Sequence, residues 1–296
     1  MPVLILLPLA CFVLAVMALR RRLPALGFGE GPYAAMVLSA ILLAGFAAAI
    51  TEVLSIVEWL SFWPVTGCWL LLLGALLLRT RLDAELRPEE RWDWKLPGAD
   101  GWRSWGTCCW IATGVLVLLA LLVAMASPPN THDALSYHLP RQLRWIEMQQ
   151  VRHYATDDMR ELSFPPLAEY LQCHTMLLTS TDLLVNLPQW AAYALAVLAS
   201  ALTCRALGYA RAAPLAALLV ACQPVAWIQS SSPKNDPVLM FLLAALAWLA
   251  AESLIRKRAS APMAMLIGLT LGLAALTKST AAVLALPLCL LIATGW

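Results

Sequence analysis

The chain has 296 residues, of which 61% are hydrophobic and only 13% are charged, and its formal net charge is +2. This composition excludes an ordinary soluble domain and is typical of an integral membrane protein. No block of like charge indicates binding to nucleic acid, which we therefore do not expect as a partner.

Long apolar runs predict an all-α, polytopic fold. A helix needs about 20 apolar residues to cross the roughly 30 Å hydrocarbon core of a bilayer, and about nine runs approach that length. In chain order they are 3–19, 33–50, 62–78, 107–126, 183–206, 212–229, 237–254, 263–276 and 281–294.

Basic clusters on alternate connections predict the orientation of these helices. The clusters lie at 20–22, 79–81, 205–211 and 256–258. Because positively charged residues favour the cytoplasmic side of a membrane, one orientation satisfies all four clusters. We therefore expect an external N-terminus, a cytoplasmic connector at 79–106 and one large external loop at 127–182.

The external loop is expected to carry the chemistry, because a loop of this length is usually functional. It also contains all the histidines of the chain: His132, His138, His153 and His174. Apolar residues at 135, 139, 143 and 146 predict an amphipathic helix along the membrane surface, which starts or kinks at Pro140. A second amphipathic helix is predicted to begin at Pro165 or Pro166, since proline is tolerated in a first helical turn.

Neither the cysteines nor the histidines predict a bound cofactor. Seven of the eight cysteines fall within apolar runs, where a free thiol behaves as a small hydrophobic group. No cysteine and histidine spacing matches a zinc site. A divalent metal held by the histidines stays open as a less favoured alternative, and we expect no cofactor.

Four motifs in order carry a resemblance to a known family. They are THDALSYHLPR at 131–141, FPPLAEY at 164–170, SSPKNDPVLMF at 231–241 and GLAALTKST at 272–280. Their order and spacing over about residues 107–296 resemble the GT-C superfamily of membrane glycosyltransferases, most closely the bacterial branch related to protein O-mannosyltransferases and to the lipid A aminoarabinose transferase. The resemblance implies a sugar transferred from a polyprenyl-phosphate donor, with inversion, outside the membrane.

The sequence departs from that family in identifiable places. Many members carry a second acid directly after the first, whereas Ala134 follows Asp133 here. Many have an arginine where this chain has LVNLPQW. Three additional apolar runs precede the family-like region, so we divide the chain into 1–106 and 107–296. Because members usually continue with more helices, we expect a longer natural protein than the segment ending at Trp296.

Asp133 is the candidate catalytic residue, and two interpretations are open. Aspartate is common as a helix N-cap or as a solvated loop residue. Alternatively, the resemblance implies that the Asp133 carboxylate is the general base that takes the proton of an acceptor hydroxyl.

Substrate and phosphate contacts are assigned to three residues near the external ends of later helices. Lys278 is expected either to reach the interface as a lipid-facing lysine or to bind the donor phosphate. Lys234 and Asp236 are expected either to pair with each other at the surface or to belong to the same site.

The loop contributes further candidate contacts. Its arginines are Arg141, Arg144, Arg152 and Arg160, and the first two are assigned to phosphate binding, with anchoring to anionic lipid as the alternative. His132 is expected to orient Asp133. His138 is expected to contact substrate or to be an ordinary polar residue on a helix face.

We therefore expect a multi-pass glycosyltransferase of the bacterial cytoplasmic membrane. Its partners are membrane lipids, a polyprenyl-phosphate-linked sugar and a glycan, lipid or protein acceptor. A lipid or solute transporter and a non-catalytic envelope-assembly protein are the alternative functions.

Overall fold

The computed structural model describes residues 2–23, 31–86, 96, 98, 104–256 and 260–295. These residues form helices and connecting segments, with no strand among them. The elements are η1 (Pro2–Ile5), α1 (Leu6–Arg20), α2 (Pro32–Ile56), α3 (Phe62–Leu86), α4 (Trp105–Ala126), η2 (Ala134–His138), α5 (Leu139–Met148), α6 (Arg160–Ser163), α7 (Leu167–Thr179), α8 (Leu187–Ala206), η3 (Ala210–Ala212), α9 (Ala213–Ala221), α10 (Pro224–Gln229), α11 (Asp236–Arg256), α12 (Ala261–Thr277) and α13 (Ala281–Gly295).

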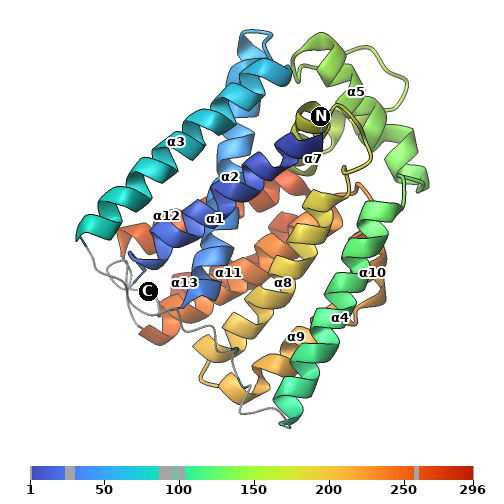
Figure 1. Ribbon diagram of the computed structural model, residues 1–296. Coiled ribbons are helices and arrows are strands. Elements are labelled where there is room, and N and C mark those ends of the chain that lie inside the picture. The colour runs from blue at the N-terminus through green and yellow to red at the C-terminus, as the bar shows by residue number, and fades with distance from the viewer. Residues whose placement is uncertain are drawn as a thin grey trace.

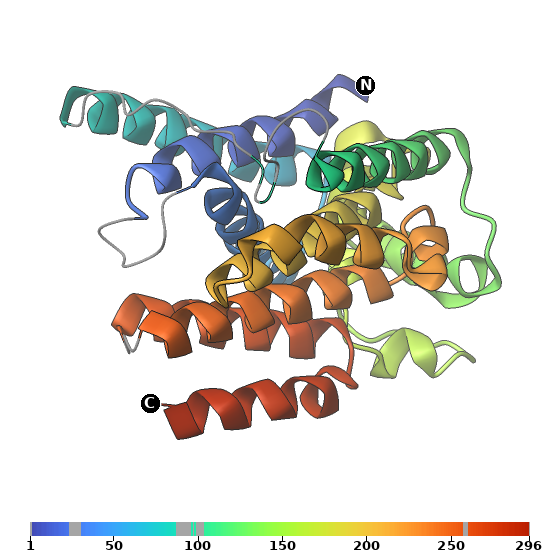
Figure 2. The same ribbon diagram turned by 90° about the horizontal axis from the view of Figure 1, so that it is seen from below.

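The long helices run side by side as a bundle, with α5 and α7 gathered at one end beside the N-terminus (Figure 1). Seen from below, α8 and α11 lie in the middle, between the first three helices and α13 (Figure 2). In the described part of the chain, six helices are long and apolar enough to cross a membrane, and three shorter apolar helices accompany them. The all-α, polytopic prediction is therefore confirmed, whereas the number of spans remains a prediction.

The predicted span at 212–229 is two helices instead of one. Helix α9 ends at Ala221, and α10 begins at Pro224. Pro224 has no backbone N–H and disfavours a helical conformation in the residue before it, and Gln223 accordingly has extended dihedrals of φ −64° and ψ 112°.

Two clusters predicted to share a membrane side lie at the same end of the bundle. An Arg22 guanidinium nitrogen lies 3.0 Å from a carboxylate oxygen of Asp83, and Arg79 lies 3.5 Å from the same carboxyl group. Parts of the predicted connector at 79–106 and of the cluster at 256–258 lie outside the described residues.

Helix α7 begins where the sequence predicts, directly after Pro166, but it does not lie on the surface. All its residues except Leu171 are buried. Its neighbours include α2, α3, α5, α8 and α12. A purely amphipathic helix would leave its polar face exposed, whereas both the polar and the apolar side chains of α7 are covered by protein.

The His174 ring, in one defined tautomer, links α7 to α2 and α3 by hydrogen bonds. The Trp69 indole Nε1 donates to His174 Nδ1 at 3.3 Å, so the imidazole proton is on Nε2 and is donated to Thr51 Oγ1 at 2.9 Å. Thr51 in turn donates to the Ala47 carbonyl at 2.8 Å. Every polar atom of the group is satisfied with a neutral ring, and burial lowers the pKa of His174 to about 4.

Helix α5 presents a polar face to the protein. His138, Arg141 and Gln142 are buried on or just before it, whereas Leu135 and Leu143 are exposed. The predicted apolar stripe is therefore divided between the interior and the surface. Exposed leucines on this outer face suit contact with lipid.

Candidate functional site

Asp133 lies in the first turn of a nearly continuous helix that runs from 132 to 148. The turn η2 is a π-helix, in which the Leu139 N–H reaches back to the Ala134 carbonyl. This wider turn precedes Pro140, which cannot donate a backbone hydrogen bond. Asp133 has helical dihedrals, and its side chain caps no backbone N–H. The N-cap interpretation of Asp133 is therefore wrong.

Asp133 instead accepts a hydrogen bond from a lysine about one hundred residues away. Lys234 Nζ lies 2.9 Å from Asp133 Oδ2. The same two segments are joined by the hydroxyls of Thr131 and Ser232, 2.8 Å apart. The hydrogen bond from Lys234 lowers the pKa of the Asp133 carboxyl group below its ordinary value. Asp133 is therefore a carboxylate near neutral pH, and 40% of its side chain remains exposed.

A second ion pair lies next to the first. Lys278 Nζ is 2.5 Å from an oxygen of Asp236, the first residue of α11. Lys234 and Asp236 are two residues apart, so their Cα atoms are at most about 7.6 Å apart. Of the two alternatives for Lys234 and Asp236, a surface pair with each other is wrong, because each residue pairs with a partner from another segment.

The structure thus brings together the four charged residues that the sequence assigned to a site near the external helix ends. Asp133 comes from the segment after α4, Lys234 and Asp236 from the start of α11, and Lys278 from the end of α12. The two carboxylates are each paired with an ammonium group, and all four side chains are partly exposed. The arrangement can offer a carboxylate to a hydroxyl group and ammonium groups to a phosphate.

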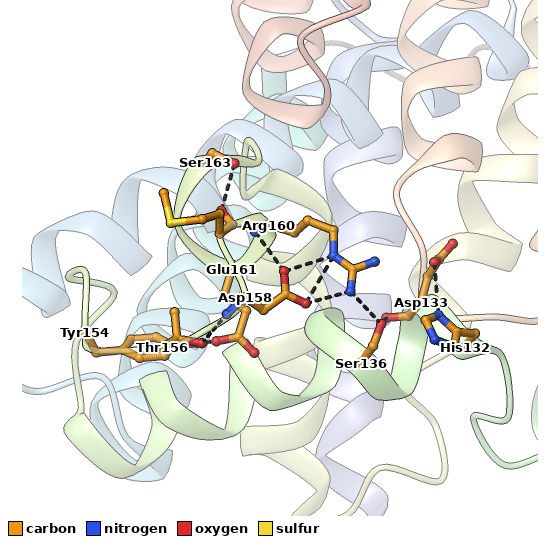
Figure 3. A network of polar contacts seen from close by, with 10 residues as sticks. His132, Asp133, Ser136, Tyr154, Thr156, Asp158, Arg160, Glu161 and Ser163 are labelled. Carbon is orange, nitrogen blue, oxygen red and sulfur yellow. Dashed lines mark hydrogen bonds and ion pairs between the residues drawn. The ribbon is translucent and has the colours of Figure 1, made fainter.

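The Arg160 side chain contacts the helix that carries Asp133 (Figure 3). Its guanidinium nitrogens lie 2.6 and 2.9 Å from the Asp158 carboxylate, and one of them also donates to Ser136 Oγ at 3.4 Å. The guanidinium carbon lies 4.5 Å from the centroid of the Tyr137 ring. Sequence reasoning placed Arg160 only among the basic residues of the loop, since no local motif shows these contacts.

His138, at the end of η2, and Arg141, on α5, do not join the exposed cluster, because both side chains are buried against Glu169 of α7. His138 Nδ1 lies 2.7 Å from Glu169 Oε1, and Arg141 lies 3.7 Å from the same oxygen. Arg141 also donates to the Phe164 carbonyl at 2.8 Å and stacks on the Trp145 ring at 4.5 Å. These contacts hold the loop helices together.

His132 and Arg144 are exposed. His132 Nδ1 lies 3.8 Å from Asp133 Oδ1, with 85% of the His132 side chain exposed. Arg144 pairs with Glu147 at 3.0 Å on the same helix. Arg144 follows Asp133 by eleven residues, which places it roughly 16 Å further along the helix axis.

The part of the chain that the structure describes contains no group of three histidine, cysteine, aspartate or glutamate side chains able to hold a metal ion. The eight cysteines are all free.

Comparison with known proteins bears on the later half of the chain. The family model for dolichyl-phosphate-mannose-protein mannosyltransferases matches residues 163–296. The matched segment is thus similar to a family of membrane glycosyltransferases that use a lipid-linked sugar, and the apolar helices agree with a multi-pass membrane protein. The matched segment contains α7, Lys234, Asp236 and Lys278, and it begins after Asp133. No curated protein and no solved structure matches the chain.

Proposed function

We propose that this protein transfers a sugar from a polyprenyl-phosphate donor to an acceptor hydroxyl, with Asp133 as the general base. The observation that carries the proposal is the cluster of Asp133, Lys234, Asp236 and Lys278. Three of these residues belong to the segment matched by a family of transferases that use lipid-linked mannose. The fourth is a partly exposed carboxylate that contacts one of the three.

The reaction follows from the positions of these charges. The acceptor oxygen attacks C1 of the sugar while its proton passes to the Asp133 carboxylate. The bond between C1 and the phosphate oxygen breaks, and its electron pair leaves with the polyprenyl phosphate. Lys278 offsets the charge that develops on this leaving group. A single displacement inverts the configuration at C1.

Lys234 has two roles in this proposal. It holds Asp133 as a carboxylate before the donor binds. When the donor phosphate enters, its negative charge competes with Asp133 for the Lys234 ammonium group. As the Lys234 ammonium group turns toward the phosphate, its hydrogen bond to Asp133 is weakened. Because that hydrogen bond lowers the Asp133 pKa, Asp133 then becomes a stronger base when the acceptor is in place.

We place this reaction on the external face of the bacterial cytoplasmic membrane. The cluster includes Asp133 of the 127–182 loop, whereas the paired Arg22 and Asp83 lie on the helix ends assigned to the cytoplasm. The acceptor is a glycan, lipid or protein that presents a hydroxyl group at this surface.

The proposal is tested with purified protein in lipid nanodiscs and a panel of radiolabelled polyprenyl-phosphate sugars. We expect one donor to label an acceptor in extracts of the envelope, with the opposite anomeric configuration in the product by NMR. A product that retains the donor configuration would exclude the single displacement. No transfer from any donor in the panel would contradict the proposed function.

A further inference from the structure

Two buried glutamines connect α5 to the segment that carries Lys234. Gln142 Nε2, on α5, donates to Gln172 Oε1, on α7, at 2.6 Å. Gln172 Nε2 donates to the Lys234 backbone carbonyl at 3.1 Å. Both glutamine side chains are completely buried. A continuous path of hydrogen bonds therefore joins three segments that are far apart in the sequence.

Together with the ion pair between Lys234 and Asp133, this path forms a closed circuit of contacts that includes the candidate base. The helix that carries Gln142 also carries Asp133, nine residues earlier, and Asp133 accepts the Lys234 ammonium at 2.9 Å. Lys234 is thus held at its carbonyl by α7 and at its ammonium by Asp133. We propose that Gln172 is a positioning residue, which fixes the Lys234 main chain so that the Lys234 ammonium meets the Asp133 carboxylate, with Gln142 orienting the Gln172 amide.

The neighbouring contacts indicate that Gln172 acts on Lys234 in particular. Asn235 is held separately, since its Nδ2 donates to the Thr277 carbonyl at 3.4 Å. Asp236 is already part of α11. The Lys234 side chain spans the distance from this bound main chain to Asp133, so a displacement of the main chain changes where the ammonium can reach. Any catalytic consequence of this positioning rests on the proposed function, but the positioning itself does not.

The first test measures the exposure of the Lys234 ammonium without any transfer assay. Purified protein in nanodiscs is treated briefly with acetic anhydride, and acetylation of Lys234 is measured by mass spectrometry relative to Lys278. In Gln172→Met, we expect Lys234 labelling to rise about fivefold relative to Lys278, which is the population change that one neutral hydrogen bond supports.

Gln189→Met is the matched control for this substitution. Gln189 is equally buried, on α8, and its side-chain amide has no hydrogen-bond partner among the described residues. We expect Lys234 labelling to stay unchanged in the control. Unchanged labelling in Gln172→Met, or an equal rise in Gln189→Met, would overturn the positioning role. Should Gln172→Met not accumulate as folded protein, Gln142→Met replaces it, and the same criteria apply.

The second test asks whether Gln172 acts through Lys234 during turnover. We expect Gln172→Met to lower kcat about 10- to 100-fold, as misplacement of a reacting group by about 1 Å does. In the Lys234→Met background the same substitution is expected to have almost no further effect, because its target is gone. Effects that multiply in the double variant would overturn the proposal. Failure of the wild-type protein to transfer any sugar would count against the proposed function alone, because the labelling experiment still decides the positioning role.

Discussion

Glu169→Gln tests the buried charges that join α5 to α7. The Glu169 side chain is completely buried, and only 5% of the Arg141 side chain is exposed. Burial lowers the pKa of the Arg141 guanidinium, and Glu169 opposes that shift. Glutamine keeps the size of the residue and can still accept a hydrogen bond from His138, but it removes the nearest counter-ion of Arg141.

The expected loss is about 3 kcal/mol in the free energy of unfolding, the lower part of the range for breaking a buried ion pair. The lower part applies because Arg141 keeps its hydrogen bond to the Phe164 carbonyl and its contact with Trp145. In a chain of 296 residues the apparent melting temperature should fall by roughly 5 °C. The assay is thermal unfolding in a mild detergent, monitored by tryptophan fluorescence.

Two further variants test whether burial sets the energy of these ion pairs. The double variant Glu169→Met with Arg141→Met should recover most of the lost stability, because apolar residues can replace a buried ion pair at little cost. Glu147→Gln removes the exposed partner of Arg144 on the same helix and should cost less than about 0.5 kcal/mol. An equal cost for Glu147→Gln and Glu169→Gln would show that burial does not decide the energy of these pairs.

Three more outcomes follow from the structure. The pKa of His174 is about 6.5 in the unfolded protein and about 4 in the folded protein, where the ring is buried. The free energy of unfolding should therefore decrease as the pH falls from about 6.5 to about 4, by about 3 kcal/mol in total. His174→Gln should flatten this dependence in melting curves recorded from pH 4 to 7.5. Lys278→Ala should weaken donor binding about 10-fold or more, measured by retention of labelled donor on nanodiscs, since it removes a charge-assisted contact. Thr156→Cys and Arg81→Cys, in a background without other cysteines, should react with a membrane-impermeant maleimide from opposite sides of sealed vesicles, and labelling from one side would contradict the proposed topology.

The sequence was sufficient to predict an all-α, polytopic fold, because hydropathy reports directly on whether a segment can cross a bilayer. It also located the start of α7, since Pro165 and Pro166 leave few alternatives. It did not show that the run at 212–229 is two helices. It could not show that α7 is buried. The polar residues Glu169, Gln172 and His174 look exposed in isolation, and their partners come from α2, α3, α5 and the Lys234 segment.

The candidate site was predictable only in part, for a related reason. A shared membrane side was enough to group Asp133 with Lys234, Asp236 and Lys278. The pairing among them depends on how α11 and α12 pack against the segment after α4, and no local pattern encodes that packing. The same limit hid Arg160, which meets the helix of Asp133 through Ser136 and Tyr137.

The most direct measurement of the central claim compares turnover and donor binding in Asp133→Asn. Asparagine keeps the size of the side chain but cannot accept the acceptor proton. We expect transfer of labelled sugar to fall about 10²- to 10⁴-fold, the usual contribution of a general base, while donor binding persists. Asp157→Asn, at an exposed acid of the same loop, serves as the control and should transfer at the wild-type rate. Wild-type turnover in Asp133→Asn would contradict the assignment of Asp133 as the base.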